Sequence, residues 1–155
     1  MAITRGKVLS VNVGLPREFE YNGRPARSAI WKSPVAGRVA ARGVNLAGDD
    51  QADRRAHGGP DKAVYAYAVE DLGWWAQEIG RPVQYGELGE NLTTEGIEVN
   101  GALVGERWAV GTTVAFGSPL LLGFFIGYPA ALGAGLVAVG AAQGGTYAGS
   151  KRALR

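Results

Sequence analysis

The sequence contains no cysteine and a single histidine, and both scarcities limit its chemistry. Without cysteine, the 155-residue chain cannot form a disulfide, use a thiol nucleophile or hold zinc or an iron–sulfur cluster through thiolates. His57 alone cannot supply a multi-histidine metal site. Hydrophobic residues make up 46% of the chain and charged residues 19%, so the protein can bury a core. The length suits one domain with or without an appendage.

Charge is missing from one end of the chain. Residues 115–150 carry none, whereas all 14 acidic residues and 13 of the 16 basic ones precede residue 115. The chain is therefore divided into residues 1–116 and an apolar, Gly/Ala-rich tail, residues 117–155. The net charge of +2 is not gathered into a basic patch, so no nucleic-acid partner is predicted. The first residues lack an apolar run typical of an export signal, and a cytoplasmic location is expected.

Hydrophobic periodicity predicts that residues 1–116 are mainly β. Alternating apolar residues favour strands over 7–13, 28–31, 35–41, 62–69 and 97–116. Leu9, Val11 and Val13 are expected to share one face of the first strand, and both faces of 62–69 are apolar or aromatic. Short strands separated by turn residues are typical of a small β-barrel.

One peripheral helix is predicted between these strands. Glu70 and Asp71 supply the acidic first turn that favours a helix N-terminus. Apolar side chains then recur at helical spacing from Leu72 to Ile79, and Gly80 and Pro82 end the pattern. The fold class is therefore mainly β with peripheral helical structure.

Polar residues gather in the glycine-rich segment 48–62, directly before a predicted strand. Glycines let backbone N–H groups approach a ligand, and successive N–H groups can form an anion-binding concavity. Lys62 adds a point charge suited to phosphate. The alternative is a solvated loop in which aspartates cap turns and glycines form them. The candidate residues are Asp49, Gln51, His57, Gly58, Gly59 and Lys62.

Two further groups are candidates on weaker grounds. Glu90 and Asn91 lie in a second glycine-rich segment, where amide and carboxylate groups could orient a ligand or a basic side chain, or simply form a capped turn. Lys32 precedes Ser33 and Pro34 and has the alternative of being an ordinary surface lysine.

Several runs of the sequence together resemble a known family. They stand in the family's order and spacing at residues 29–39, 46–53, 57–67, 89–94 and 105–111. In these runs the chain resembles the MOSC domain family, the C-terminal domain type of molybdenum-cofactor sulfurases, and within it the small stand-alone, YiiM-like branch. The resemblance covers about residues 5–116.

The resemblance implies a β-barrel domain that binds the molybdenum cofactor, a pterin phosphate that carries molybdenum on a dithiolene. It also implies reduction of small N-hydroxylated substrates with electrons from a partner protein. Lys32 and Lys62 would pair with the cofactor phosphate, and the backbone of Gly58 and Gly59 would approach the pterin. His57 would donate to a ligand of the metal or support its neighbours. The remaining pocket residues, hydrogen-bonding the cofactor, would be Asp49, Gln51, Glu90 and Asn91.

The tail departs from the family. Members continue after this point through a segment whose cysteine is taken as the thiolate on molybdenum, and this chain has no cysteine. The expectation is therefore impaired reduction of N-hydroxylated compounds, with a non-catalytic molybdopterin-binding or carrier module as the alternative.

Three interpretations of residues 117–155 stay open at this point. A shifted reading frame in a GC-rich gene would produce such an Ala/Gly/Leu-rich, acid-free stretch. An appendage that completes the barrel is the second interpretation. The third is a membrane tether through residues 119–142, which are uncharged and long enough to span a bilayer, with Lys151, Arg152 and Arg155 on the cytoplasmic side.

Overall fold

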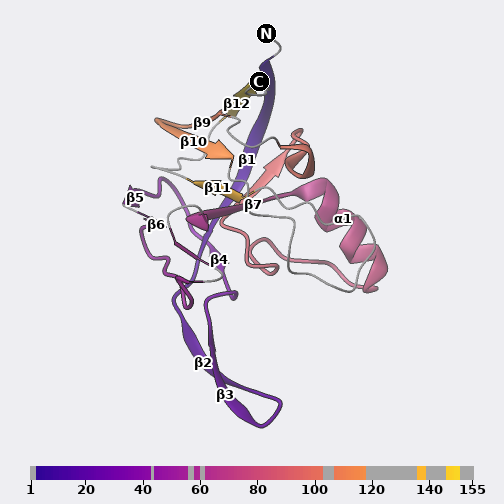
Figure 1. Cartoon of the computed structure of the whole chain (residues 1–155). Coiled ribbons are helices and arrows are strands. Elements are labelled where there is room, and N and C mark those ends of the chain that lie inside the picture. The colour runs from indigo at the N-terminus through magenta and orange to yellow at the C-terminus, as the bar shows by residue number, and fades with distance from the viewer. Residues whose placement is uncertain are drawn as a thin grey trace.

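The computed structural model describes residues 3–42, 44–55, 58–59, 62–102, 107–117, 136–138 and 146–150. Within them the protein is mainly β with one α-helix, α1 (Val69–Glu78). A main sheet of eight strands carries the fold, and two small two-stranded sheets accompany it. Figure 1 shows the long first strand, β1 (Ile3–Val13), running past most of the other elements.

The main sheet has the strand order β12-β9-β10-β11-β7-β8-β1-β4. Strand β12 also pairs with β1, so the pairings run through seven strands and return to the first. All the pairings of this sheet are antiparallel except that of β7 with β8, which is parallel because α1 connects the two strands. The remaining strands are β4 (Ser33–Pro34), β7 (Val64–Ala68), β8 (Leu92–Glu95), β9 (Arg107–Val110), β10 (Thr113–Gly117), β11 (Leu136–Ala138) and β12 (Thr146–Ser150).

The prediction for one face of β1 is wrong at one residue. Leu9 is 38% exposed, whereas Val11 is 4% exposed and Val8 packs against the core. The register of β1 against β8 shifts between Val8 and Ser10. A β-bulge inserts a residue into one strand and so reverses the alternation of faces at that point. The bulge places the end of β1, where the polar site lies, in its observed register.

The strand and helix predicted over residues 62–79 are confirmed. In β7, Val64, Ala66 and Ala68 are buried, and Tyr67 on the other face is also buried. Helix α1 follows without a break, with Glu70 and Asp71 in its first turn. The chain then passes Gly80, whose φ of +70° suits a helix C-terminus.

Other predicted strands are wrong. Of residues 28–31 only Ser28 lies in a strand, as the last residue of β3 (Arg24–Ser28), and 35–41 contributes only its last residue to β5 (Ala41–Arg42), which pairs with β6 (Asn45–Leu46). Between them, Ser33 and Pro34 form β4, because this segment pairs with the end of β1 at the edge of the main sheet, where a proline is tolerated. The predicted strand from Ile97 begins instead with a 3-10 turn, Val99–Gly101, and strands appear only at β9 and β10.

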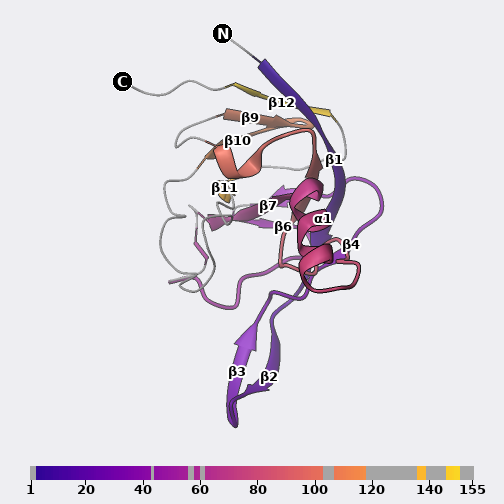
Figure 2. The ribbon, with the colours of Figure 1, turned by 90° about the vertical axis from the view of Figure 1, so that its right-hand side faces the viewer.

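A β-hairpin that the sequence reading missed extends from the rest of the molecule (Figure 2). Strands β2 (Arg17–Tyr21) and β3 (Arg24–Ser28) pair around Asn22 and Gly23, which have φ values of 51° and 72°. Two positive φ angles define the type I′ turn, and an Asn-Gly pair is its strongest sequence signal. The Asn22-Gly23 dipeptide could therefore have predicted this hairpin from the sequence.

Two groups of buried side chains hold the fold together. The main core contains Trp108, the largest fully buried side chain, with Leu46, Val64 and Leu92 among its neighbours. A second group lies under α1, where Leu72 packs with Tyr67. Trp108 and Val110 confirm the period-two pattern predicted for the region of β9, because both are buried while Arg107 and Ala109 are exposed.

The described parts of the tail belong to the main sheet. Strand β11 pairs with β10 and β7, and β12 pairs with β9 and β1. The interpretation of the tail as an appendage that completes the barrel stays a prediction. Among the described residues there is no helix long and apolar enough to cross a membrane. Most of the predicted span 119–142 lies outside the described residues.

Candidate functional site

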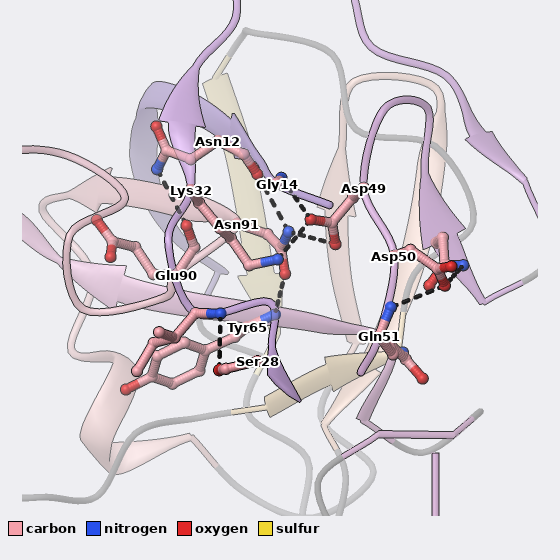
Figure 3. Close-up of polar contacts among 12 residues, drawn as sticks. Asn12, Gly14, Ser28, Lys32, Asp49, Asp50, Gln51, Tyr65, Glu90 and Asn91 are labelled. Atoms are coloured by element: carbon pink, nitrogen blue, oxygen red, sulfur yellow. Dashed lines mark hydrogen bonds and ion pairs between the residues drawn. The ribbon is translucent and has the colours of Figure 1, made fainter. Parts of the chain in front are cut away.

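A buried ion pair lies where β1 ends. The Lys32 Nζ donates to Asp49 Oδ1 at 2.5 Å, and the two side chains are only 8% and 2% exposed. The backbone N–H of Gly14 donates to the same oxygen at 2.8 Å, and Asn91 Nδ2 donates to Asp49 Oδ2 at 3.0 Å. Both carboxylate oxygens are therefore partnered (Figure 3). The interpretation of Lys32 as a surface lysine is wrong.

Two asparagines extend this ion pair across three strands. Besides Asp49, the Asn91 amide donates to the carbonyl oxygen of Asn12 at 3.1 Å, and its Oδ1 accepts the N–H of Tyr65 at 3.1 Å. Asn12 is fully buried, and its Nδ2 donates to the Glu90 carbonyl oxygen and to Thr93 Oγ1. Because these side chains bond to β1, β7 and β8 at once, they fix the ends of the three strands relative to one another.

Glu90 is a fully buried carboxyl group beside this network. Its Oε1 accepts the N–H of Gly86 at 2.5 Å and the hydroxyl of Thr93 at 3.0 Å. Its Oε2 has no hydrogen-bond partner within the described part of the chain. Burial away from water raises the pKa of Glu90, against hydrogen bonds that lower it. The protonated form is thus favoured relative to a solvated glutamate.

Gln51 organises the glycine-rich loop. Its Oε1 accepts the N–H of Gly59 at 2.7 Å, and its Nε2 donates to the carbonyl oxygens of Val44 and Lys62. Gly58 is required here because a Cβ at this position would meet the Gln51 amide and the Asp53 carbonyl oxygen. Gly59 has a φ of +93°, which side-chain-bearing residues rarely adopt. The glycines therefore pack the loop onto Gln51.

The structure brings the predicted residues together in two groups. Lys32, Asp49, Glu90 and Asn91 belong to the buried network, and Gln51, Gly58, Gly59 and Lys62 belong to the loop beside it. The backbone N–H of Lys62 donates to the Gly59 carbonyl oxygen at 3.2 Å, and its side chain is half-buried. His57 lies outside the described residues.

A surface hollow that the sequence reading did not identify lies next to the loop. It has a volume of about 550 Å³. Its lining includes Arg27, Asp50, Gln51, Asp53, Arg54 and Arg55. Arg54-Arg55 was visible in the sequence as a basic pair beside the glycines. Arg27 comes from β3 and could be placed only by knowing the β2–β3 hairpin.

Asp50 is held on the rim of this hollow. Its Oδ1 accepts from Arg54 Nη2 at 2.8 Å, from the N–H of Gln51 at 2.8 Å and from Asn45 Nδ2 at 3.2 Å. The hydrogen bond from Arg54 is the largest cause that lowers the pKa of Asp50. This carboxylate therefore stays ionised and offsets one of the three arginines.

The chain is similar to known proteins over part of its length. Residues 53–118 match the model of the MOSC domain. The uncharacterised protein YflK of Bacillus subtilis (strain 168) is 39% identical over 102 residues, which are 66% of this chain and 46% of YflK. The protein YiiM of Escherichia coli (strain K12) is 36% identical over 91 residues, covering 56% of this chain and 40% of YiiM. The chain thus spans less than half the length of these relatives.

A solved structure supports the fold. The crystal structure of YiiM from Escherichia coli aligns with 96% of this chain and 71% of its own, with a TM-score of 0.58 and 21% identity. At this identity the likeness establishes a shared mainly-β fold.

Proposed function

Because residues 53–118 match the model of the MOSC domain, we propose that the chain is a MOSC-family protein and binds the molybdenum cofactor through the cofactor's phosphate and pterin. The family is associated in general with this cofactor. The matched range holds Gly58, Gly59, Lys62, Glu90 and Asn91, and this coincidence of family match and polar loop carries the proposal.

The seven-strand circuit of pairings supports a small barrel as the form of the domain. We propose that the sheet curls so that β12 meets β1, which is the way a sheet removes its exposed edges. The polar network lies where β1 ends and where β7 and β8 begin, and loops carried by a rigid sheet are where ligand-binding residues commonly lie.

The residues of this chain fit the organic part of the cofactor. Lysine and arginine side chains near the glycine loop suit a phosphate. Gln51 is bonded to Gly59, Val44 and Lys62, so we assign it a positioning role for the loop. Asp49 and Asn91 have their polar atoms engaged within the protein, so we assign them a positioning role. Asp49 offsets the charge of Lys32, so we assign Lys32 a positioning role as well. We propose Lys62, which lies within the matched range, for the phosphate.

The residues of this chain do not fit the metal itself. In the family that the chain resembles, a cysteine thiolate is taken as the protein ligand of molybdenum, and this sequence has no cysteine. The cofactor, when bound, supplies redox chemistry. Reduction of an N-hydroxylated substrate to the amine consumes two electrons and two protons and releases water, and a partner protein would supply the electrons. We propose that this reduction is weak in this chain and that binding of the cofactor, as in a carrier module, is the activity retained.

Elemental analysis tests the proposal. The chain is purified from a host supplied with molybdate and cofactor synthesis, and molybdenum and pterin are measured per mole of protein. Both are expected in the wild type and reduced in the Lys62→Ala variant, with Lys7→Ala, an exposed lysine of β1, as the matched control. Protein free of molybdenum and pterin would contradict the proposal. Rapid turnover of a hydroxylamine substrate would contradict the carrier assignment.

A further inference from the structure

The surface hollow beside the glycine loop combines side chains that lie far apart in the sequence. We call it the arginine hollow and define it by Arg27, Asp50, Gln51, Asp53, Arg54 and Arg55, which line about 550 Å³. Arg27 belongs to the hairpin strand β3, and the others belong to the loop after β6. The pairing of β2 with β3 therefore decides that a third arginine joins the pair in the loop.

The charges in the arginine hollow are not balanced. Asp50 pairs with Arg54 at 2.8 Å, where the side chains are 37% and 61% exposed. The Asp53 carboxylate accepts the backbone N–H of Arg55 at 2.8 Å. This hydrogen bond does not involve the guanidinium group of Arg55. Neither Arg27 nor Arg55 has a side-chain partner among the residues that the structure describes. Two guanidinium groups thus border the hollow without a described carboxylate on either.

We propose that the arginine hollow binds an anionic group, a phosphate ester or a carboxylate, on a small molecule. The planar guanidinium matches both groups in geometry and charge, and cavities of several hundred Å³ are typical of small-ligand sites. This inference does not rest on cofactor binding, because it depends only on the arginines and on the shape of the surface.

Gln51 connects the arginine hollow with the glycine loop. It lines the hollow, and the same side chain accepts from Gly59 and donates to the Lys62 carbonyl oxygen. A ligand whose anionic group lies in the hollow would therefore extend toward the loop that the family match covers. The two sources of such an anion are the phosphate of the proposed cofactor and the anionic group of a separate substrate.

Titration with pyrophosphate and with citrate, followed by calorimetry or by backbone NMR shifts, tests the proposal on the full chain. Arg55→Ala and Arg27→Ala are each expected to weaken binding about 5- to 10-fold, because each removes a charged hydrogen-bond donor. Arg24→Ala on the same hairpin and Arg38→Ala are the matched controls and should bind as the wild type does. Circular dichroism verifies that each variant is folded.

Asp50→Asn provides a test in the opposite direction. The amide keeps an oxygen acceptor for Gln51 and Asn45 but removes the charge that offsets Arg54. Binding of pyrophosphate is expected to strengthen about 2- to 5-fold, the range of an exposed ion pair. Unchanged binding in Arg27→Ala and Arg55→Ala, or equal weakening in Arg24→Ala and Arg38→Ala, would overturn the proposal.

Molybdenum content of the same variants distinguishes the two sources of the anion. If the hollow holds the cofactor phosphate, Arg27→Ala and Arg55→Ala lose molybdenum along with pyrophosphate binding. If it holds another ligand, they lose only pyrophosphate binding. Both results support the anion site. A wild type that binds pyrophosphate but never acquires molybdenum would overturn the proposed cofactor function and leave the anion site standing.

Discussion

Asp49 and Asp50 are neighbours in the sequence, and each forms an ion pair with a basic side chain, yet their surroundings are opposite. Asp49 is 2% exposed, pairs with a buried lysine and accepts two further hydrogen bonds. Asp50 is 37% exposed and pairs with an arginine on the rim of an open hollow. The chain turns between them, because the Asp49 N–H bonds to Leu46 and the Asp50 N–H to Gly14.

This difference shows that burial, more than residue type, decides whether a charged side chain stabilises the fold or stays accessible to a ligand. A buried ion pair must recover a large desolvation cost through good geometry and extra hydrogen bonds, and losing one partner leaves an uncompensated charge. An exposed pair is screened by water and salt and contributes little to stability. The buried network therefore fixes the three strands relative to one another, whereas the exposed charges of the arginine hollow are the ones that we propose for anion binding.

The largest expected effect is on the buried pair. Asp49→Ala should lower the free energy of unfolding by about 3–5 kcal/mol, since it leaves the Lys32 ammonium buried without its carboxylate. Asp50→Ala should lower it by no more than about 1 kcal/mol. Urea denaturation of both variants measures the contrast.

A double variant shows whether the loss of stability in Asp49→Ala comes from the unpaired charge. Asp49→Leu combined with Lys32→Met removes both charges and should recover much of the loss from Asp49→Ala, because no charge is then left unpaired in the interior. Equal effects of Asp49→Ala and Asp50→Ala would remove the distinction between the two regions.

A smaller effect is expected where the two regions meet, at Gly58. Gly58→Ala should lower the free energy of unfolding by about 1–3 kcal/mol, because the added methyl group displaces Gln51 from Gly59. Gly73→Ala is the matched control, since this exposed position in α1 has open space around it and should gain up to about 1 kcal/mol. Pyrophosphate titration of Gly58→Ala shows whether the displaced Gln51 also changes the hollow. If Gly58→Ala is as stable as the wild type, the loop does not pack on Gln51 as described.

The smallest expected effect concerns Glu90 and depends on pH. Because its pKa is raised in the folded protein, the folded state holds the proton more tightly than the unfolded state does. The contribution to stability is fully present below the unfolded value near 4.5 and is lost as the pH rises through the folded pKa. The unfolding free energy of the wild type relative to Glu90→Gln should therefore fall with rising pH, by at most about 1.4 kcal/mol per pH unit.

Chemical denaturation of the two proteins between pH 4 and 8 measures this difference. Glu18→Gln, on the exposed hairpin strand β2, is compared in parallel to subtract the general effect of removing one carboxyl group. A difference between wild type and Glu90→Gln that stays constant, or rises with pH, would show that burial does not govern this carboxyl.

Local sequence patterns were sufficient for some elements and insufficient for others. The helix after Ala68 and the buried strand before it follow from the spacing of apolar residues within each segment. Pairing with distant strands does not alter either element. Ser33 and Pro34 form a strand only because the distant end of β1 lies beside them. The face of Leu9 was misplaced because a bulge has no strong signal in one strand alone.

For the candidate site, the sequence indicated which loops hold polar residues and which family they resemble. It could not show that Lys32 and Asp49 neutralise each other, because they are 17 positions apart and meet through folding. It also missed Arg27, which reaches the hollow only through the β2–β3 pairing.

The sequence by itself determined the mainly-β class, the helix α1, the absence of any thiolate and the position of the glycine loop, since composition and short-range periodicity carry this information. Only the tertiary structure decided which charges are buried and paired and which face solvent. The physical reason is that the energy of a charge depends on its distance from water and from other charges. Those distances are fixed when β1, β7 and β8 meet, and no single stretch of sequence contains them.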